Sequence, residues 1–154
     1  MTYIQRLLIA GVGAIMVQAP LAHAAPHATA ADARTMLESA VQTVNRVGAE
    51  QAMAQFNQKN GPFNTGELYV FAFDMNGVYQ AYGAQPGLTG KNVSDLTDAE
   101  GKPIVRDMIA IAKASGRGQI NYVWLNRADN HVEHKLSLIE RVGDQVIGVG
   151  YYPD

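Results

Sequence analysis

The sequence predicts an α+β domain: a five-stranded antiparallel sheet, a long helix on one face and a loop with a short helix over the other. Three observations support this. An amphipathic stretch comes before any strand. A run of aromatic and branched residues then ends in Asn76-Gly77, a strong hairpin signal. Three further extended runs follow with short loops between them, and strands joined in this way must be antiparallel neighbours.

The composition fits one globular domain. The chain has 154 residues, of which 47% are hydrophobic and 17% charged, enough for one core and too apolar for a disordered chain. The formal net charge of −2 provides no basic surface, so we expect no nucleic-acid partner. There is no cysteine, which excludes disulfides, thiolate zinc sites and thiol catalysis.

Residues 1–24 have the pattern of a cleaved secretory signal peptide. Arg6 precedes an apolar run over residues 7–17, and Ala22-His23-Ala24 provides a cleavage site with small residues at both ends. The run is shorter than the roughly 20 apolar residues that span a bilayer. An uncleaved anchor is the alternative interpretation.

The predicted cleavage sets the domain boundaries. Residues 25–31 form an alanine-rich, flexible spacer, and residues 32–154 form a single domain. We therefore expect an exported protein, periplasmic or secreted.

The stretch Asp32–Asn57 is predicted to be one long helix. Apolar residues such as Leu37 and Val44 recur near helical spacing. Gly48 weakens the middle of this helix by up to about 1 kcal/mol relative to alanine.

A central hairpin should follow. The run Glu67–Asp74 is apolar on both faces, as expected of a central strand covered on both sides. Asp74-Met75-Asn76-Gly77 is the turn, in which we expect Asp74 to act as a cap, and Val78–Tyr82 is the second strand.

Residues 83–116 are predicted to form a roof over the sheet. The first part is irregular and punctuated by glycine, and Pro103 is well placed for the first turn of a helix that ends at Gly116. A long irregular segment over a sheet is a typical place for a small-molecule pocket.

The last three strands are predicted at Gln119–Leu125, His131–Val142 and Gln145–Tyr152. In the first of them Tyr122 and Trp124 share a face, because side chains alternate along a strand.

Several motifs, in this order and spacing, resemble the single Cache domain, the PAS-like extracytoplasmic sensor module of bacterial chemoreceptors and sensor kinases. They are Asp74-Met75-Asn76-Gly77, Gly90-Lys91-Asn92, Asp98-Ala99-Glu100-Gly101-Lys102-Pro103 and Gly148-Val149-Gly150-Tyr151-Tyr152. The resemblance extends from about Met53 to Tyr152 and implies a PAS-like fold that senses a small ligand. One departure is Tyr82-Gly83, where the family often has His-Pro.

The resemblance also implies partners. A receptor of this family would continue into a membrane helix and a signalling domain. We therefore expect this chain to pass its signal to a separate protein, such as a membrane receptor or a sensor kinase. Receptors of the family often pair through the N-terminal helix, so the resemblance implies a homodimer. The apolar stripe of that helix is narrow and fits a monomer as well as a dimer.

Five residues are candidates for ligand binding. Lys135 matches a lysine that recurs in the family, and the resemblance implies that it holds a ligand carboxylate. The alternative is a lysine that faces solvent. Tyr122 and Trp124 could form an aromatic wall, and Phe71 could contribute to it, although core packing explains these residues as well. Tyr82 stands where the family usually has a histidine near the pocket.

We find no catalytic or metal-binding pattern and predict no enzyme activity, cofactor or metal site. There is no Gly-x-Ser-x-Gly, no phosphate-binding glycine loop and no His-Glu-x-x-His. His131 and His134 lie three apart in a strand, so they point to opposite faces.

The predicted function is sensing of a small polar metabolite, and a short carboxylate is the expected ligand. A second hypothesis is a protein interaction module whose pocket is filled by its own aromatic side chains. A secreted enzyme is the third.

Overall fold

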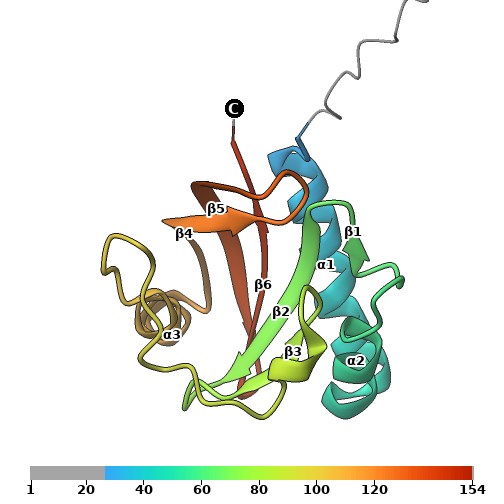
Figure 1. Cartoon of the computed structure of the whole chain (residues 1–154). Coiled ribbons are helices and arrows are strands. Elements are labelled where there is room, and N and C mark those ends of the chain that lie inside the picture. The colour runs from blue at the N-terminus through green and yellow to red at the C-terminus, as the bar shows by residue number, and fades with distance from the viewer. Residues whose placement is uncertain (1–26, 154) are drawn as a thin grey trace, which may run out of the picture.

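The structure is a computed structural model that describes residues 27–153. The predicted signal peptide lies outside these residues. The helices are α1 (Ala30–Val47), α2 (Ala49–Phe56), the short 3₁₀ helix η1 (Pro86–Leu88) and α3 (Ile104–Ser115). The strands are β1 (Asn64–Thr65), β2 (Leu68–Asp74), β3 (Tyr79–Tyr82), β4 (Arg117–Asn126), β5 (His131–Val142) and β6 (Gln145–Tyr151) (Figure 1).

The strands form one antiparallel sheet. Its order is β1-β2-β6-β5-β4, and β3 also pairs with β2. The predicted α+β class is confirmed, with one correction to the strand count: the sheet has six strands instead of five. The additional strand, β1, has only two residues, too few for an alternating pattern to be visible in the sequence.

The prediction of one helix over 32–57 is wrong, because the chain breaks at Gly48 into α1 and α2. Gly48 has φ 83° and ψ 162°, a conformation that is costly for residues with a Cβ. Its N–H still donates to the Val44 carbonyl at 2.9 Å, so α1 ends with its last hydrogen bond made. The break allows α2 to turn and pack beside β2 and β3.

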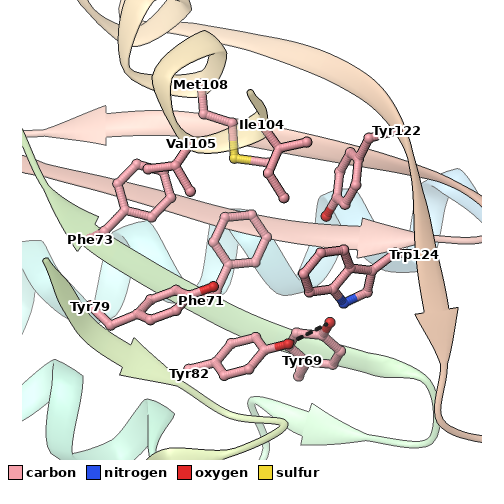
Figure 2. Close-up of a pocket in the computed structure, with 10 residues that line it drawn as sticks. All are labelled: Tyr69, Phe71, Phe73, Tyr79, Tyr82, Ile104, Val105, Met108, Tyr122 and Trp124. Carbon is pink, nitrogen blue, oxygen red and sulfur yellow. Dashed lines mark hydrogen bonds between the residues drawn. The ribbon is translucent and has the colours of Figure 1, made fainter. Parts of the chain in front are cut away.

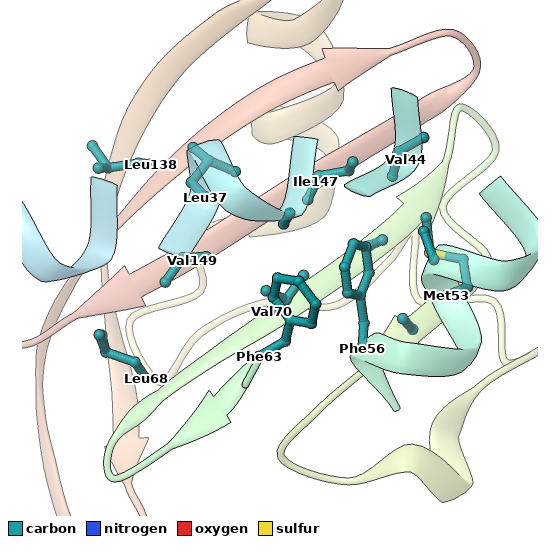
Figure 3. Packing of buried hydrophobic residues seen from close by; sticks show 14 of the residues in the cluster. Leu37, Val44, Met53, Phe56, Phe63, Leu68, Val70, Leu138, Ile147 and Val149 are labelled. Carbon is teal, nitrogen blue, oxygen red and sulfur yellow. The ribbon is translucent and has the colours of Figure 1, made fainter. Parts of the chain in front are cut away.

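One face of the sheet is covered by α1 and α2, as predicted; we call it the helix face (Figures 1 and 3). Alternation along the strands directs Val70 and Ala72 of β2 to this face, together with Ile147 and Val149 of β6. Phe56 of α2 packs edge-on against Phe63, with 4.7 Å between the ring centroids. The side chains in this core are mostly aliphatic.

The opposite face is covered by residues 83–116, as predicted; we call these residues the roof and this side of the sheet the roof face. α3 begins after Pro103 and ends at Gly116, which has φ 71°. Asp98 ties the irregular part of the roof to the edge strand: its carboxylate accepts the N–H groups of Val123 at 3.0 Å and of Glu100 and Lys102 at 2.9 Å. These bonds, that of Val123 above all, lower the pKa of Asp98.

The hairpin turn between β2 and β3 is also as predicted. Asp74 Oδ1 accepts the N–H groups of Asn76 at 2.9 Å and Val78 at 3.0 Å. Gly77 has φ 79°, and a Cβ there would lie 2.9 Å from Ser94. The turn therefore requires glycine both for its backbone and for the close approach of the roof.

Candidate ligand-binding site

A small pocket lies between the roof face and α3 (Figure 2). Ten residues line it: Tyr69, Phe71, Phe73, Tyr79, Tyr82, Ile104, Val105, Met108, Tyr122 and Trp124. We call this the aromatic pocket. The free space inside it is about 20 Å³, which is room for about one water molecule. In this conformation its own side chains nearly fill it.

The pocket has a polar end and an apolar end. Figure 2 shows the indole nitrogen of Trp124 near the hydroxyl groups of Tyr69 and Tyr82, which are 3.5 Å apart. Phe73 and Val105 lie at the opposite end. A ligand with a hydrogen-bonding head and a short apolar tail matches this arrangement.

Lys135 lies behind the polar end. Its side chain is fully buried, so the alternative of a lysine in solvent is wrong. Nζ donates to the hydroxyl groups of Tyr69 at 3.1 Å and Tyr152 at 3.3 Å, and lies 4.3 and 4.5 Å from the centroids of the same two rings. Lys135 does not itself line the pocket; it reaches the pocket through Tyr69.

Two glycines of β6 make room for these side chains. A Cβ at Gly150 would lie 2.2 Å from Lys135 Cε, and one at Gly148 would lie 2.2 Å from the tip of the Phe71 ring. Real Cβ atoms do not approach so closely, so Lys135 and Phe71 can lie flat across β6 only because these positions are glycine. This gives the Gly148-Val149-Gly150 motif a physical role in the site.

Burial decides the protonation of the site. It lowers the pKa of Lys135 to about 7, and the nearby carboxylate of Glu67 opposes this shift. Burial raises the pKa of Tyr79 and Tyr122 above the usual value for a phenol, so both are neutral near pH 7. Tyr122 bonds to Ser137 Oγ at 2.9 Å. The site therefore offers neutral phenols and a poorly solvated amine.

The structure brings four of the five predicted site residues together: Phe71, Tyr82, Tyr122 and Trp124 all line the pocket. The fifth, Lys135, contacts its wall.

Sequence reasoning missed both tyrosines to which Lys135 donates, Tyr69 and Tyr152. It also missed five more residues of the pocket lining: Phe73, Tyr79, Ile104, Val105 and Met108. The signal for Tyr69 was present, because it lies two residues before Phe71 and must share its face. Tyr152 follows the end of β6, where strand alternation no longer predicts direction.

Within residues 27–153 no group of three or more acidic, histidine or cysteine side chains is arranged to hold a metal ion. His131 instead pairs with Asp129, with 3.2 Å between Nδ1 and Oδ2. In the same part of the chain, no helix has the length and apolar character needed to cross a membrane.

Comparison with known protein families identifies the family of this domain. The model of the Cache domain family matches residues 35–154. The chain belongs to the Cache domain family. As a Cache domain it is an extracytoplasmic sensor domain, the role in which such domains serve chemoreceptors and sensor kinases.

One curated relative is similar over part of the chain. The sensor histidine kinase MctS of Rhizobium johnstonii is 33% identical over 88 residues, which are 56% of this chain and 19% of the kinase. The chain thus spans about a fifth of that kinase's length.

Two solved structures share the fold. A methyl-accepting chemotaxis protein from Vibrio parahaemolyticus has a TM-score of 0.67 at 24% identity, covering 80% of this chain and 88% of that one. A Cache chemosensory domain described for carboxylic acid recognition has a TM-score of 0.66 at 21% identity, covering 80% and 92%.

Proposed function

We propose that this Cache domain binds a short carboxylate at the aromatic pocket and passes its ligand state to a separate partner protein. The observation that carries the proposal is Lys135: its amine is fully buried behind the polar end of the pocket, and within residues 27–153 its hydrogen bonds go to phenols. A buried amine of this kind gains most from an anion that can approach it. The similar fold described for carboxylic acid recognition supports the same ligand class.

The charges around the pocket narrow the ligand further. All ten lining residues are aromatic or aliphatic, and none carries a carboxylate or a cation. Lys135 therefore offers one positive charge, and the lining offers nothing to balance an ammonium group. A second carboxylate or an amino group on the ligand would be buried without a partner, which costs free energy. The site favours a monocarboxylate with a short hydrocarbon tail.

Ligand entry requires a conformational change, because a volume of about 20 Å³ holds no carboxylate. The side of the roof next to β4 is the part that can open, because it joins β4 through side-chain bonds from Asp98 and Lys102 rather than through a strand ladder. The other side of the roof is held to β3 by backbone bonds. The ligand would bind an open minor state and shift the population toward it. The altered roof would then be the surface that a partner receptor or kinase recognises.

The same small volume favours the second hypothesis, an interaction module with a filled pocket. In that case Phe71, Tyr122 and Trp124 would be permanent core residues. The two hypotheses differ in whether any ligand stabilises the fold.

Binding can be tested by thermal unfolding and calorimetry with propionate and butyrate, compared with succinate, alanine and butyramide. We expect the monocarboxylates to raise the melting temperature by several degrees near 100 times their Kd, since this occupancy adds about 2.7 kcal/mol. Lys135→Met should abolish the response, and Lys113→Met, at an exposed position of α3, should retain it. If none of these compounds stabilises the protein at millimolar concentration, the filled-pocket hypothesis replaces the sensor.

We also infer that residues 1–24 are removed on export and that residues 32–154 act as one unit, without enzyme activity. N-terminal sequencing of the exported protein tests the cleavage site. Sedimentation tests the homodimer that the family resemblance implies through the N-terminal helix.

A further inference from the structure

Glu67, just before β2, holds the segment that precedes α1. Its side chain is only 8% exposed. The backbone N–H of Ala28 donates to Oε1, and Nδ1 of His27 lies 3.0 Å from Oε2. The amide of Asn126, a fully buried residue at the end of β4, also donates to Oε2, at 3.3 Å. One carboxylate therefore joins the start of the described chain to two strands of the sheet.

The same carboxylate is linked to the buried amine of Lys135 through Asn126, Leu125 and Tyr152. Glu67 favours the charged form of Lys135, although no carboxylate within residues 27–153 lies at ion-pair distance from Nζ. Lys135 also donates to Tyr152 near the other end of the chain, and the Tyr152 hydroxyl donates to the Leu125 carbonyl at 2.9 Å. Tyr152 and Ala28 line a common groove, so both ends of the described chain lie next to the tyrosine that Lys135 bonds to.

We propose that Glu67 couples occupancy of the aromatic pocket to the segment before α1: an anion bound at Lys135 weakens the hold of Glu67 on Ala28. This rests on the proposed function, because it requires a carboxylate to bind near Lys135. It adds the route by which occupancy of the pocket affects the segment before α1.

The physical reason is that two anions would share one buried cation. In the empty domain the field of Lys135 offsets the cost of burying Glu67. A ligand carboxylate near Lys135 weakens the attraction between Lys135 and Glu67 and also repels Glu67. Both electrostatic effects are strong where water is excluded. The least costly response is for Glu67 to move toward solvent, which breaks its bond to Ala28. Coupling between two sites is reciprocal, so a tighter bond to Ala28 would also weaken ligand binding.

The Ala28 amide is a direct probe, because its N–H donates to Glu67. We would follow its proton shift and its hydrogen exchange by NMR while titrating propionate into the purified protein. We expect saturation to accelerate exchange at Ala28 by about fivefold or more, the lower end of usual coupling between two sites, and to move its proton resonance upfield. Unchanged or slower exchange in a protein that binds propionate overturns the coupling.

Two variants separate coupling from a merely structural role. Glu67→Gln keeps an oxygen that can accept the Ala28 N–H but removes the charge. Exchange at Ala28 should therefore be the same with and without propionate, while propionate still raises the melting temperature. Thr29→Ala removes the cap of α1, in which Thr29 and Asp32 bond to each other, but leaves Glu67 in place. Exchange should be faster in this variant and should still respond to propionate. A ligand response at Ala28 that persists in Glu67→Gln contradicts the proposal.

The failure of this inference differs from failure of the proposed function. Propionate binding with no change at Ala28 removes only the coupling. The absence of binding by any monocarboxylate removes the proposed ligand itself.

Discussion

The two faces of the sheet have different chemistry, although the same strands supply both. On the helix face, β2 and β6 present Val70, Ala72, Ile147 and Val149, which pack against α1 and α2. On the roof face the same two strands present Tyr69, Phe71 and Phe73 beside glycines, over which Phe71 and Lys135 lie. One face is a filled aliphatic core. The other contains tyrosine hydroxyls, a buried amine and an irregular cover.

This difference indicates that the helix face stabilises the fold and that the roof face contains a group that destabilises it. Burial of aliphatic side chains stabilises the fold at about 25 cal/mol per Å² with no polar cost. A buried amine without an ion pair opposes folding, because it loses its hydration. The roof face thus retains a destabilising group, which agrees with our proposal that this face binds a ligand.

The largest expected effect on stability is on the helix face. Phe56 is fully buried, and Phe56→Ala should lower the free energy of unfolding by about 3–5 kcal/mol in urea titrations. The folded fraction should bind propionate as the wild type does. Val132→Ala, at a side chain that is 61% exposed, should cost less than about 0.5 kcal/mol. The proposed difference between the two faces is wrong if Phe56→Ala lowers the free energy of propionate binding as much as it lowers the free energy of unfolding.

On the roof face, Lys135→Met should stabilise the protein while it abolishes binding. The folded-state pKa of about 7 lies below the ordinary value of 10.5. Between these pH values the unfolded chain binds more protons, so wild-type stability rises with pH, and the cost of the buried charge is complete below pH 7.

We therefore expect a gain of about 1–4 kcal/mol at pH 6, shrinking toward pH 9.5, measured by urea unfolding at both values. Lys113→Met is the control and should change stability by less than about 0.5 kcal/mol at either pH. A loss of stability at pH 6 would show that Lys135 is structural.

A smaller effect is expected from the glycines under the site. The Cβ of Gly150→Ala would collide with Lys135 Cε and, at 2.5 Å, with Ser137 Oγ. We expect a loss of about 1–3 kcal/mol from overpacking and weaker propionate binding, because the amine must move. Gly87→Ala, with no atom within 4 Å of its Cβ, is the matched control. Equal effects of the two changes would show that β6 does not position Lys135.

Much of the fold follows from local patterns. β5 has the predicted bounds, and the turn at Asp74–Gly77 and the helix after Pro103 lie where turn and cap residues place them. The two errors have different causes. Gly48 was seen only as a weak point in a helix, because a positive φ cannot be distinguished from mere flexibility in the sequence. β1 exists only because Asn64 and Thr65 meet β2.

The candidate site was less predictable. Alternation placed Tyr122 with Trp124, but could not show that β2 and β4 face one pocket beneath α3. For Lys135 the sequence left solvent and pocket equally open, because a strand has two faces and alternation does not say which one is covered.

The sequence by itself determined the class of fold, the order of its elements and the polarity of their faces, since these depend on neighbours within a few positions. Only the tertiary structure decided that Lys135 is buried between Tyr69 and Tyr152, and that Glu67 accepts the N–H of Ala28. Those contacts join residues 17 to 66 positions apart. Their energies depend on how completely the surrounding side chains exclude water, which no local pattern records.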